Sequence, residues 1–139
     1  MPTVHRRTGL EVIDRAECLR LLASDPVGRV AMVVGARPMI FPVNYALDGD
    51  SIVFRSDAGS KVSGATRGFP MSFEIDGIDE ILHTGWSVVV NGVGREIVDG
   101  TELARLRALE LRPWASGPKT HWIRIHPKTI TGRRVARED

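Results

Sequence analysis

The sequence has one cysteine, few aromatic residues and no long apolar run, and each shortage argues against a class of protein. The lone Cys18 cannot form an internal disulfide, which fits a reducing cytoplasm. Apolar runs such as Val88-Val89-Val90 are far shorter than the about 20 residues of a membrane-spanning helix. The first residues carry charge but no apolar segment follows them, so a secretory signal is not expected. We therefore expect a cytoplasmic protein without a membrane span.

Net charge is also small, at +2 from 19 basic and 17 acidic side chains. The basic residues gather near the two ends of the chain, whereas a nucleic-acid-binding protein interleaves them with exposed aromatic residues on one face. Small β-barrels often bind single strands, so nucleic-acid binding stays an alternative, and salt-dependent oligonucleotide binding would favour it. Nucleic acid is not the partner that we expect.

The 139 residues suffice for one domain with one core, in which residues 1–13 and 135–139 are expected to be loose tails. Asp14 and Glu17 form a capping box at the start of a predicted helix over residues 14–23. A second helix is predicted from Thr101, which can cap it, to about Leu111.

Most of the remaining chain has the short apolar segments and turn residues that are typical of strands. The hairpin turns lie at residues 35–38 and 48–50. Helices come only between groups of strands, so the pattern predicts a mostly antiparallel β-barrel. The predicted strands cover residues 28–34, 39–45, 51–55, 71–76, 85–97 and 120–126, with an extended tail over 129–135.

The segment over residues 54–61 joins a predicted strand to a short helix and is rich in groups that bind anions. Arg55 can donate two hydrogen bonds to one phosphate, Lys61 adds a positive charge, and Ser56 and Ser60 offer hydroxyls. Backbone N–H groups add to this if Ser60 caps the helix. The segment therefore predicts a phosphate cradle, and the alternative is a solvated loop with two surface cations.

The strand predicted over residues 85–97 is apolar on both faces, because Trp86, Val88 and Val90 alternate with Ser87 and Val89. A barrel wall that also contacts a second subunit would cover both faces, which predicts a dimer. Residues 77–84, which precede this strand, are expected to be a polar linker.

Other candidate sites fail on spacing. His121 and His126 lie five residues apart in a predicted strand and should point to opposite faces, so no metal site is expected. The sequence around Ser87 lacks the closing glycine and the sharp turn of a nucleophile elbow. No residue is assigned a catalytic role.

Several segments taken together resemble the pyridoxamine 5'-phosphate oxidase-like, flavin-binding split barrels, most closely the small actinobacterial and nitroimidazole-resistance-like members. The resemblance covers residues 14–134 and depends on the order and spacing of its motifs. These motifs lie at residues 25–30, 42–45, 54–61, 73–74, 85–88, 122–125 and 131–133.

The resemblance implies a homodimer of six-stranded antiparallel split β-barrels, with FMN sites at the subunit interface that both chains contact. The phosphate would be bound in the 54–61 segment, the flavin ring would lie along residues 42–45, residues 85–87 would approach from the partner, and Trp122 would line the same cleft. The cofactor-binding residues so implied are Pro42, Val43, Asn44, Tyr45, Phe54, Arg55, Ser56, Ser60, Lys61, Gly85, Trp86, Ser87 and Trp122.

The implied function is an FMN-dependent oxidoreductase that transfers hydride between the flavin and a small organic substrate. Relatives of this kind also bind the deazaflavin F420 or haem, so an F420-dependent reductase and a non-catalytic flavin or haem carrier are the alternatives. The true vitamin B6 oxidase is longer and has a basic set for its substrate's phosphate that has no counterpart here, so pyridoxamine phosphate is not the expected substrate.

Overall fold

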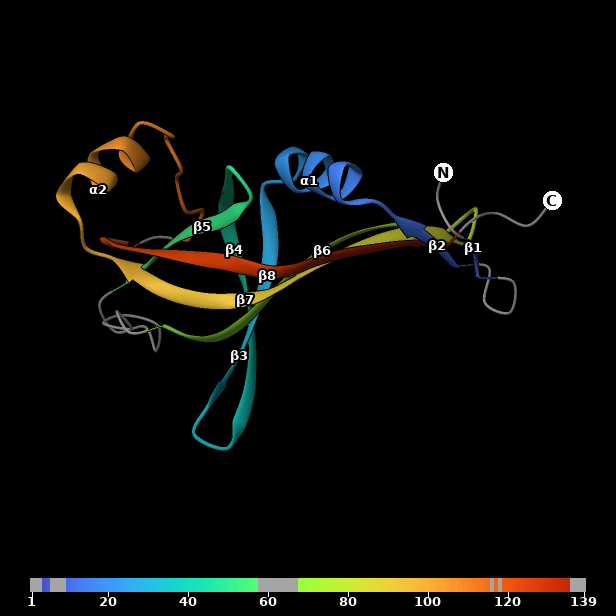
Figure 1. The fold of residues 1–139 in the computed structure, drawn as a ribbon, viewed down its shortest axis with the longest axis horizontal. Coiled ribbons are helices and arrows are strands. Elements are labelled where there is room, and N and C mark those ends of the chain that lie inside the picture. The colour runs from blue at the N-terminus through green and yellow to red at the C-terminus, as the bar shows by residue number, and fades with distance from the viewer. Residues whose placement is uncertain (1–3, 6–9, 58–67, 116, 118, 136–139) are drawn as a thin grey trace.

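A closed ring of antiparallel strands forms the body of the protein, with one helix above each half of it (Figure 1). The structure is a computed structural model and describes residues 4–5, 10–57, 68–115, 117 and 119–135. Its elements are β1 (Val4–His5), β2 (Leu10–Ile13), α1 (Arg15–Ser24), β3 (Val27–Val34), β4 (Arg37–Asp48), β5 (Ser51–Ser56), β6 (Phe69–Asp79), β7 (Thr84–Ile97), α2 (Gly100–Arg107) and β8 (His121–Val135).

Among the described residues, six strands close the ring in the order β8-β5-β4-β3-β6-β7, and β7 pairs back onto β8. The edge of β8 that does not face β7 pairs with two strands. Its residues 121–125 pair with β5, and its residues 132–135 pair with β2. Every pairing is antiparallel, which confirms the predicted six-stranded split barrel. The β3–β4 hairpin projects away from the ring on the side opposite the helices (Figure 1).

Alternate residues of the strands fill the inside of the ring. Met71, Phe73 and Ile75 are buried, as their alternation with polar residues predicted. The Phe73 ring meets Tyr45 edge-on with 4.6 Å between ring centroids, and the Tyr45 hydroxyl donates a 2.6 Å hydrogen bond to the carbonyl of Leu22. This bond fastens α1 over the barrel core.

Both helices begin at an aspartate. In α1, Asp14 accepts a 2.9 Å hydrogen bond from the Glu17 N–H, which confirms the predicted cap. The start of α2 was predicted wrongly: Asp99 takes the capping position in place of Thr101 and accepts from the Glu102 N–H at 2.9 Å. A carboxylate two residues upstream of the threonine gives the helix an equally good cap and a favourable charge at its N-terminus.

Three segments are more ordered than the sequence predicted. Residues 77–79 continue β6 and Thr84 begins β7, so the expected linker shortens to a turn at residues 80–83. Trp86 packs over Gly77, where no Cβ intervenes. Residues 10–13 pair with β8 and are not a loose tail. The expected strand and tail after residue 120 form one strand, with an irregularity opposite Asn91 and Gly92. None of the described helices is long and apolar enough to cross a membrane.

A glycine beneath the central aromatic ring gives a test of this packing. A Cβ on Gly28 would overlap the ring of Phe73, which is fully buried and cannot move aside. We expect Gly28→Ala to lower the free energy of unfolding by about 1–3 kcal/mol, as overpacked core substitutions do. Urea denaturation measures this. Gly100→Ala is the matched control, because nothing lies within 4 Å of the added methyl, and an equal loss in both variants would contradict the explanation.

Candidate functional site

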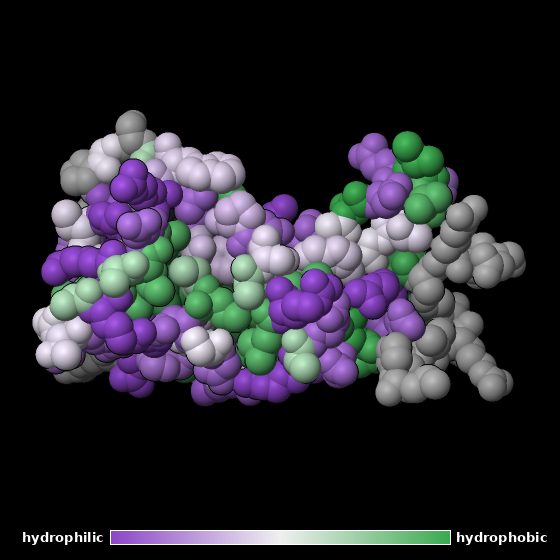
Figure 2. Space-filling model, turned by 90° about the horizontal axis from the view of Figure 1, so that it is seen from above, coloured by the Kyte–Doolittle hydropathy of each residue, from purple (hydrophilic) through white to green (hydrophobic). Residues whose placement is uncertain are grey.

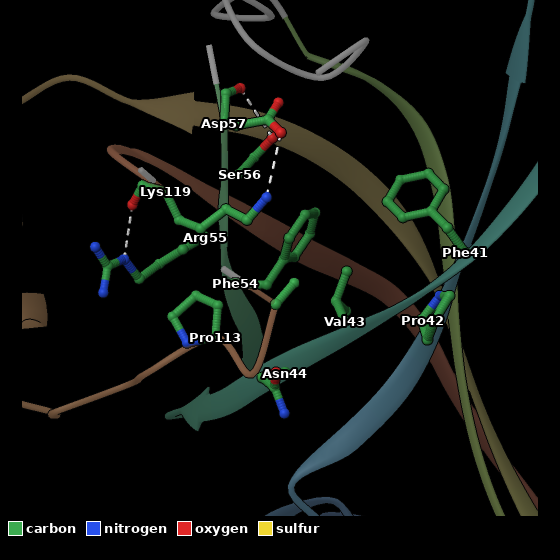
Figure 3. Close-up of a pocket in the computed structure, with 11 residues that line it drawn as sticks. Phe41, Pro42, Val43, Asn44, Phe54, Arg55, Ser56, Asp57, Pro113 and Lys119 are labelled. Carbon is green, nitrogen blue, oxygen red and sulfur yellow. Dashed lines mark hydrogen bonds and ion pairs between the residues drawn. The ribbon is translucent and has the colours of Figure 1, made fainter. Parts of the chain in front are cut away.

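A cavity of about 210 Å³ opens beside the C-terminal end of β5, where β4, β5 and the segment that precedes β8 meet (Figure 3). The β5–β8 pairing aligns Ser56 with His121, so residues just before β8 lie beside residues just after β5. The lining residues are Phe41, Pro42, Val43, Asn44, Phe54, Arg55, Ser56, Asp57, Pro113, Ala115 and Lys119.

One side of the cavity is apolar. Phe41 and Val43 alternate on β4 and therefore share a face of the strand, and Pro113 lies across from Val43 (Figure 3). Asn44 fixes the covering segment, because its Oδ1 accepts a 2.7 Å hydrogen bond from the backbone N–H of Trp114. This side suits a planar, apolar group.

The other end of the cavity is polar. The Lys119 ammonium turns into it and lies 3.2 Å from the Asp57 Oδ2 (Figure 3). Ser56 is buried, and its hydroxyl donates a long hydrogen bond of 3.4 Å to the Asp57 carbonyl. The ammonium of Lys119 and the hydroxyl of Ser56 thus line the same cavity. The positive charge of Lys119 offsets the negative charge of the Asp57 carboxylate.

The side chain of Arg55 points away from Phe41 and Val43 (Figure 3). It does so because adjacent residues of a strand face opposite sides, and its neighbours on β5 are the ones that face the apolar side of the cavity. Its Nε donates to the Lys119 carbonyl at 2.8 Å and its Nη1 to the Leu111 carbonyl at 3.0 Å. The guanidinium also lies over Trp122, 5.3 Å from the ring centroid. Arg55 therefore ties the segment before β8 to the barrel, and its predicted contact with a phosphate stays a prediction.

The predicted site residues divide into five groups. Pro42, Val43 and Asn44 join Phe54, Arg55 and Ser56 around the cavity. The Tyr45 side chain lies in the barrel core, where burial raises the pKa of its hydroxyl. Trp122 is packed under α2 with Val53, Ile97 and Leu106 and lines a neighbouring cavity.

Gly85, Trp86 and Ser87 do not reach this cavity. Gly85 and Trp86 line a separate one with Arg134 and Val135, at the other end of the pairing between β7 and β8. Ser60 and Lys61 lie outside the described residues. Within one chain, the structure therefore brings together the β4 and β5 parts of the predicted site and leaves the β7 part away from them.

Five lining residues were not predicted: Phe41, Asp57, Pro113, Ala115 and Lys119. The position of Phe41, two residues before Val43 on one face of a strand, was a usable signal. Lys119 can be assigned to the cavity only when the register of β5 against β8 is known, because the two strands are more than 60 residues apart in the sequence.

Ion pairs hold α2 and the covering segment in place. Asp48 accepts hydrogen bonds from both terminal nitrogens of Arg105, at 2.9 and 2.8 Å, and lies 2.9 Å from Nη1 of Arg124. Arg124 also contacts Glu102 on α2 at 2.6 Å. The hydrogen bond from Arg105, followed by that from Arg124, lowers the pKa of Asp48 from 3.8 to about 2.

Comparison with known proteins gives one family. A family model described as pyridoxamine 5'-phosphate oxidase matches residues 14–134. An uncharacterised protein of Mycobacterium tuberculosis is 38% identical over 128 residues, which cover 88% of this chain and 84% of that protein.

Solved structures are similar over most of their length. An FAD binding protein from Mycobacterium smegmatis is 36% identical, with a TM-score of 0.72 over 88% of this chain and 96% of that one. A putative pyridoxamine 5'-phosphate oxidase from Corynebacterium glutamicum is 29% identical, with a TM-score of 0.77 over 94% of this chain and 97% of that one. An FAD and haem binding protein from Mycobacterium smegmatis, at 21% identity and a TM-score of 0.65 over 86% and 70% of the two chains, is similar in fold.

The Asp48 cluster gives a pH-dependent prediction. With a folded pKa of about 2 against 3.8, the ionised carboxylate contributes stability that is present above about pH 4 and is lost as the pH falls toward 2. We expect Asp48→Asn to unfold with a free energy roughly 1–3 kcal/mol lower at pH 7, and this difference to shrink between pH 4 and pH 2. Urea denaturation across this range measures it.

Asp50→Asn is the matched control, because Asp50 is in the same turn but its pair with Arg15 is 54% exposed on both sides. Its effect should stay within about 0.5 kcal/mol. A pH-independent difference for Asp48→Asn would show that the carboxylate's charge is not what holds α2.

Proposed function

Because the chain belongs to the pyridoxamine 5'-phosphate oxidase family, we propose that it is a flavin-dependent oxidoreductase that transfers hydride between a bound flavin and a small organic molecule. The observation that carries the proposal is the cavity whose apolar wall on β4 leads to the hydroxyl of Ser56 and the ammonium of Lys119. The similarity to an FAD binding protein at 36% identity supports a flavin as the ligand.

The residues fit a flavin nucleotide. Phe41, Val43 and Pro113 offer an apolar surface for the ring, and the backbone of residues 42–44 can reach its polar edge. Ser56 and Lys119 offer a hydroxyl and a charge for a phosphate. The Asp57 carboxylate would repel that phosphate, but its pairing with Lys119 removes most of this cost.

A bound flavin supplies the hydride acceptor and donor itself, so the chain has only to bind and orient its reactants. The expected flavin is FMN, as the resemblance to flavin-binding split barrels implied. A deazaflavin or haem in the same cavity, and a carrier without turnover, are the alternatives.

Cofactor titration tests this function. We expect the purified protein to bind FMN, and to bind riboflavin through the flavin ring that both ligands share. Lys119→Ala should lower the affinity for FMN about tenfold and leave the affinity for riboflavin unchanged, because only FMN has the phosphate. Lys128→Ala, an exposed lysine on β8, is the control. Fluorescence quenching measures both affinities. A protein that binds F420 or haem and neither flavin contradicts the proposal.

Two further measurements separate the alternatives. If the Arg55 guanidinium contacts the phosphate, Arg55→Ala should lower the affinity for FMN alone. If the guanidinium acts by holding the segment before β8, the variant should lower the affinities for FMN and riboflavin equally. Reduction of the bound flavin by NAD(P)H, followed by reoxidation by an acceptor, distinguishes an enzyme from a carrier, whose flavin need not turn over.

We also propose that the protein is a homodimer and that Gly85, Trp86 and Ser87 complete the site of the partner subunit. In one chain none of these residues lines the cavity beside β5, and Gly85 and Trp86 line a separate one, so a second copy is needed to bring them to it. Exposed apolar side chains support a second copy, with Val33 66% and Ile40 72% exposed on the β3–β4 hairpin. Figure 2 shows further hydrophobic surface across the middle of the face seen from above and on a projection at one end.

A charge on the hairpin tests the dimer. We expect Val33→Asp to shift the protein from dimer to monomer and to weaken flavin binding, because a carboxylate in an apolar contact is poorly solvated. Light scattering after gel filtration measures the mass. Val98→Asp is the matched control, since Val98 is 65% exposed and immediately precedes the α2 cap. A monomeric wild-type protein with full flavin affinity would refute the shared site.

A further inference from the structure

The outward face of β3, β6 and β7 has a cavity of about 240 Å³, separate from the flavin cavity. Phe73 and Ile75 are buried in the barrel core, so Glu74 and Asp76, which alternate with them on β6, face outward. Arg29 lies beside them, because the β3–β6 pairing places it opposite Glu74. The apolar side chains that line the same cavity are Ala31, Ile40 and Val89.

One guanidinium meets two carboxylates on this face. Nη1 of Arg29 lies 3.4 Å from Oε1 of Glu74, and its Nη2 lies 3.7 Å from Oδ1 of Asp76. Burial, followed by the hydrogen bond with Asp76 and the negative charge of Asp76, raises the pKa of Glu74 from 4.5 to about 7. A single chain therefore holds a proton on this pair of carboxylates below about pH 7 and releases it above.

The neighbouring strands do not balance the second carboxylate. On β7, Val89 lies opposite Glu74 and Ser87 lies opposite Asp76, and neither carries a charge. On β8, Arg133 lies opposite Ser87 and is one strand further from the pair. Among the described residues, no salt bridge joins Arg133 to a carboxylate. The excess of one carboxylate per chain is therefore local to this face.

A second copy of the chain fits this face. The exposed Val33 and Ile40 lie on it, because the β3–β4 pairing aligns Ile40 with Ala31 and Val33 follows Ala31 by two residues. A two-fold contact places the same patch against itself, so the guanidinium of one chain can meet a carboxylate of the other. Ser87, which we propose completes the partner's flavin site, lies on the same face opposite Asp76.

Such a contact brings an excess of negative charge together. Each copy contributes two carboxylates and one guanidinium, so one carboxylate per copy has no cation. Burying an unpaired ion against apolar side chains is costly. A proton on each pair of carboxylates removes this cost, because one ionised carboxylate then remains for each guanidinium.

We propose that this face is the contact between two subunits, and that assembly takes up one proton per subunit on the Glu74 and Asp76 carboxylates. A rise in pH then separates the subunits and withdraws residues 85–87 from the flavin site of the partner. This inference rests on the proposed homodimer and its shared flavin site. It makes the completion of that site depend on pH.

The direction of the effect follows from the proton balance. Because the contact opposes the ionised pair, the pKa of Glu74 is higher in the dimer than its value of about 7 in the single chain. Below about pH 7 both states hold the proton and the affinity between subunits is constant, whereas above it the affinity falls as the pH rises. Net charge acts in the opposite direction, because the chain approaches its isoelectric point near 9.1 and repulsion between copies weakens.

Fluorescence-detected sedimentation of the full chain at pH 7 and pH 9 measures the dissociation constant of the dimer. We expect the wild-type constant to rise about tenfold or more between these values, since each proton taken up gives up to tenfold per pH unit. Glu74→Gln and Asp76→Asn should each abolish the rise, because either leaves one carboxylate for each guanidinium. Asp50→Asn removes an exposed carboxylate from the β4–β5 turn and should keep the wild-type rise.

The outcomes separate this inference from the flavin function. A wild-type dissociation constant that is equal at both pH values overturns the proton linkage, and so does a rise that persists in both carboxylate variants. Wild type that is monomeric at both pH values overturns the contact itself. FMN titration at pH 7 is scored separately: if wild type binds no flavin, the proposed function fails, and the sedimentation data still decide the assembly.

Discussion

The pairing of β7 with β8 is the constraint on which the rest of the structure depends, because it closes the sheet into a ring. The two strands run together from Gly85 opposite Val135 to Ile97 opposite Trp122. Closure leaves β8 without a free edge over its first residues, where β5 takes its other side. The strands approach so closely at Gly92 that a Cβ there would collide with the carbonyl oxygen of His126, and the register shifts at this point.

Closure also determines where ligands can be held. Strand β5 is short and is buried on both faces, by the barrel core on the side of Ile52 and by α2 on the side of Val53. At its end the same alternation places Ser56 at one cavity and aims the Arg55 guanidinium toward the other. Two adjacent cavities on either side of one strand end therefore follow from strand geometry, once the segment before β8 covers that end.

The sequence predicted well what depends on local pattern. The alternation at Met71, Phe73 and Ile75 gave the buried face of β6, and Asp14 gave the start of α1. The resemblance to flavin-binding split barrels gave the family and the ring of six strands. The prediction failed where polar residues form regular structure, as in residues 77–79, which were expected in a linker but pair with residues 84–86.

Contacts between distant segments were beyond the sequence for a physical reason. Whether Arg55 meets a ligand or a backbone carbonyl depends on the path of residues 111–119, which no periodicity determines. The residues around Lys119 in the sequence do not show whether its side chain is solvated or lies in a cavity. Only the register of β5 against β8 distinguishes these two cases. Trp122 was assigned to the flavin cleft on resemblance; its ring lies beneath Arg55, and its contact with a flavin stays a prediction.

The two cations near the end of β5 differ in what they can offer a phosphate. Lys119 is shared with Asp57, so a phosphate in the flavin cavity competes with a carboxylate for the same ammonium. Arg55 has two of its donors engaged by carbonyls that it also positions. Each therefore contributes less to binding one phosphate than its charge suggests.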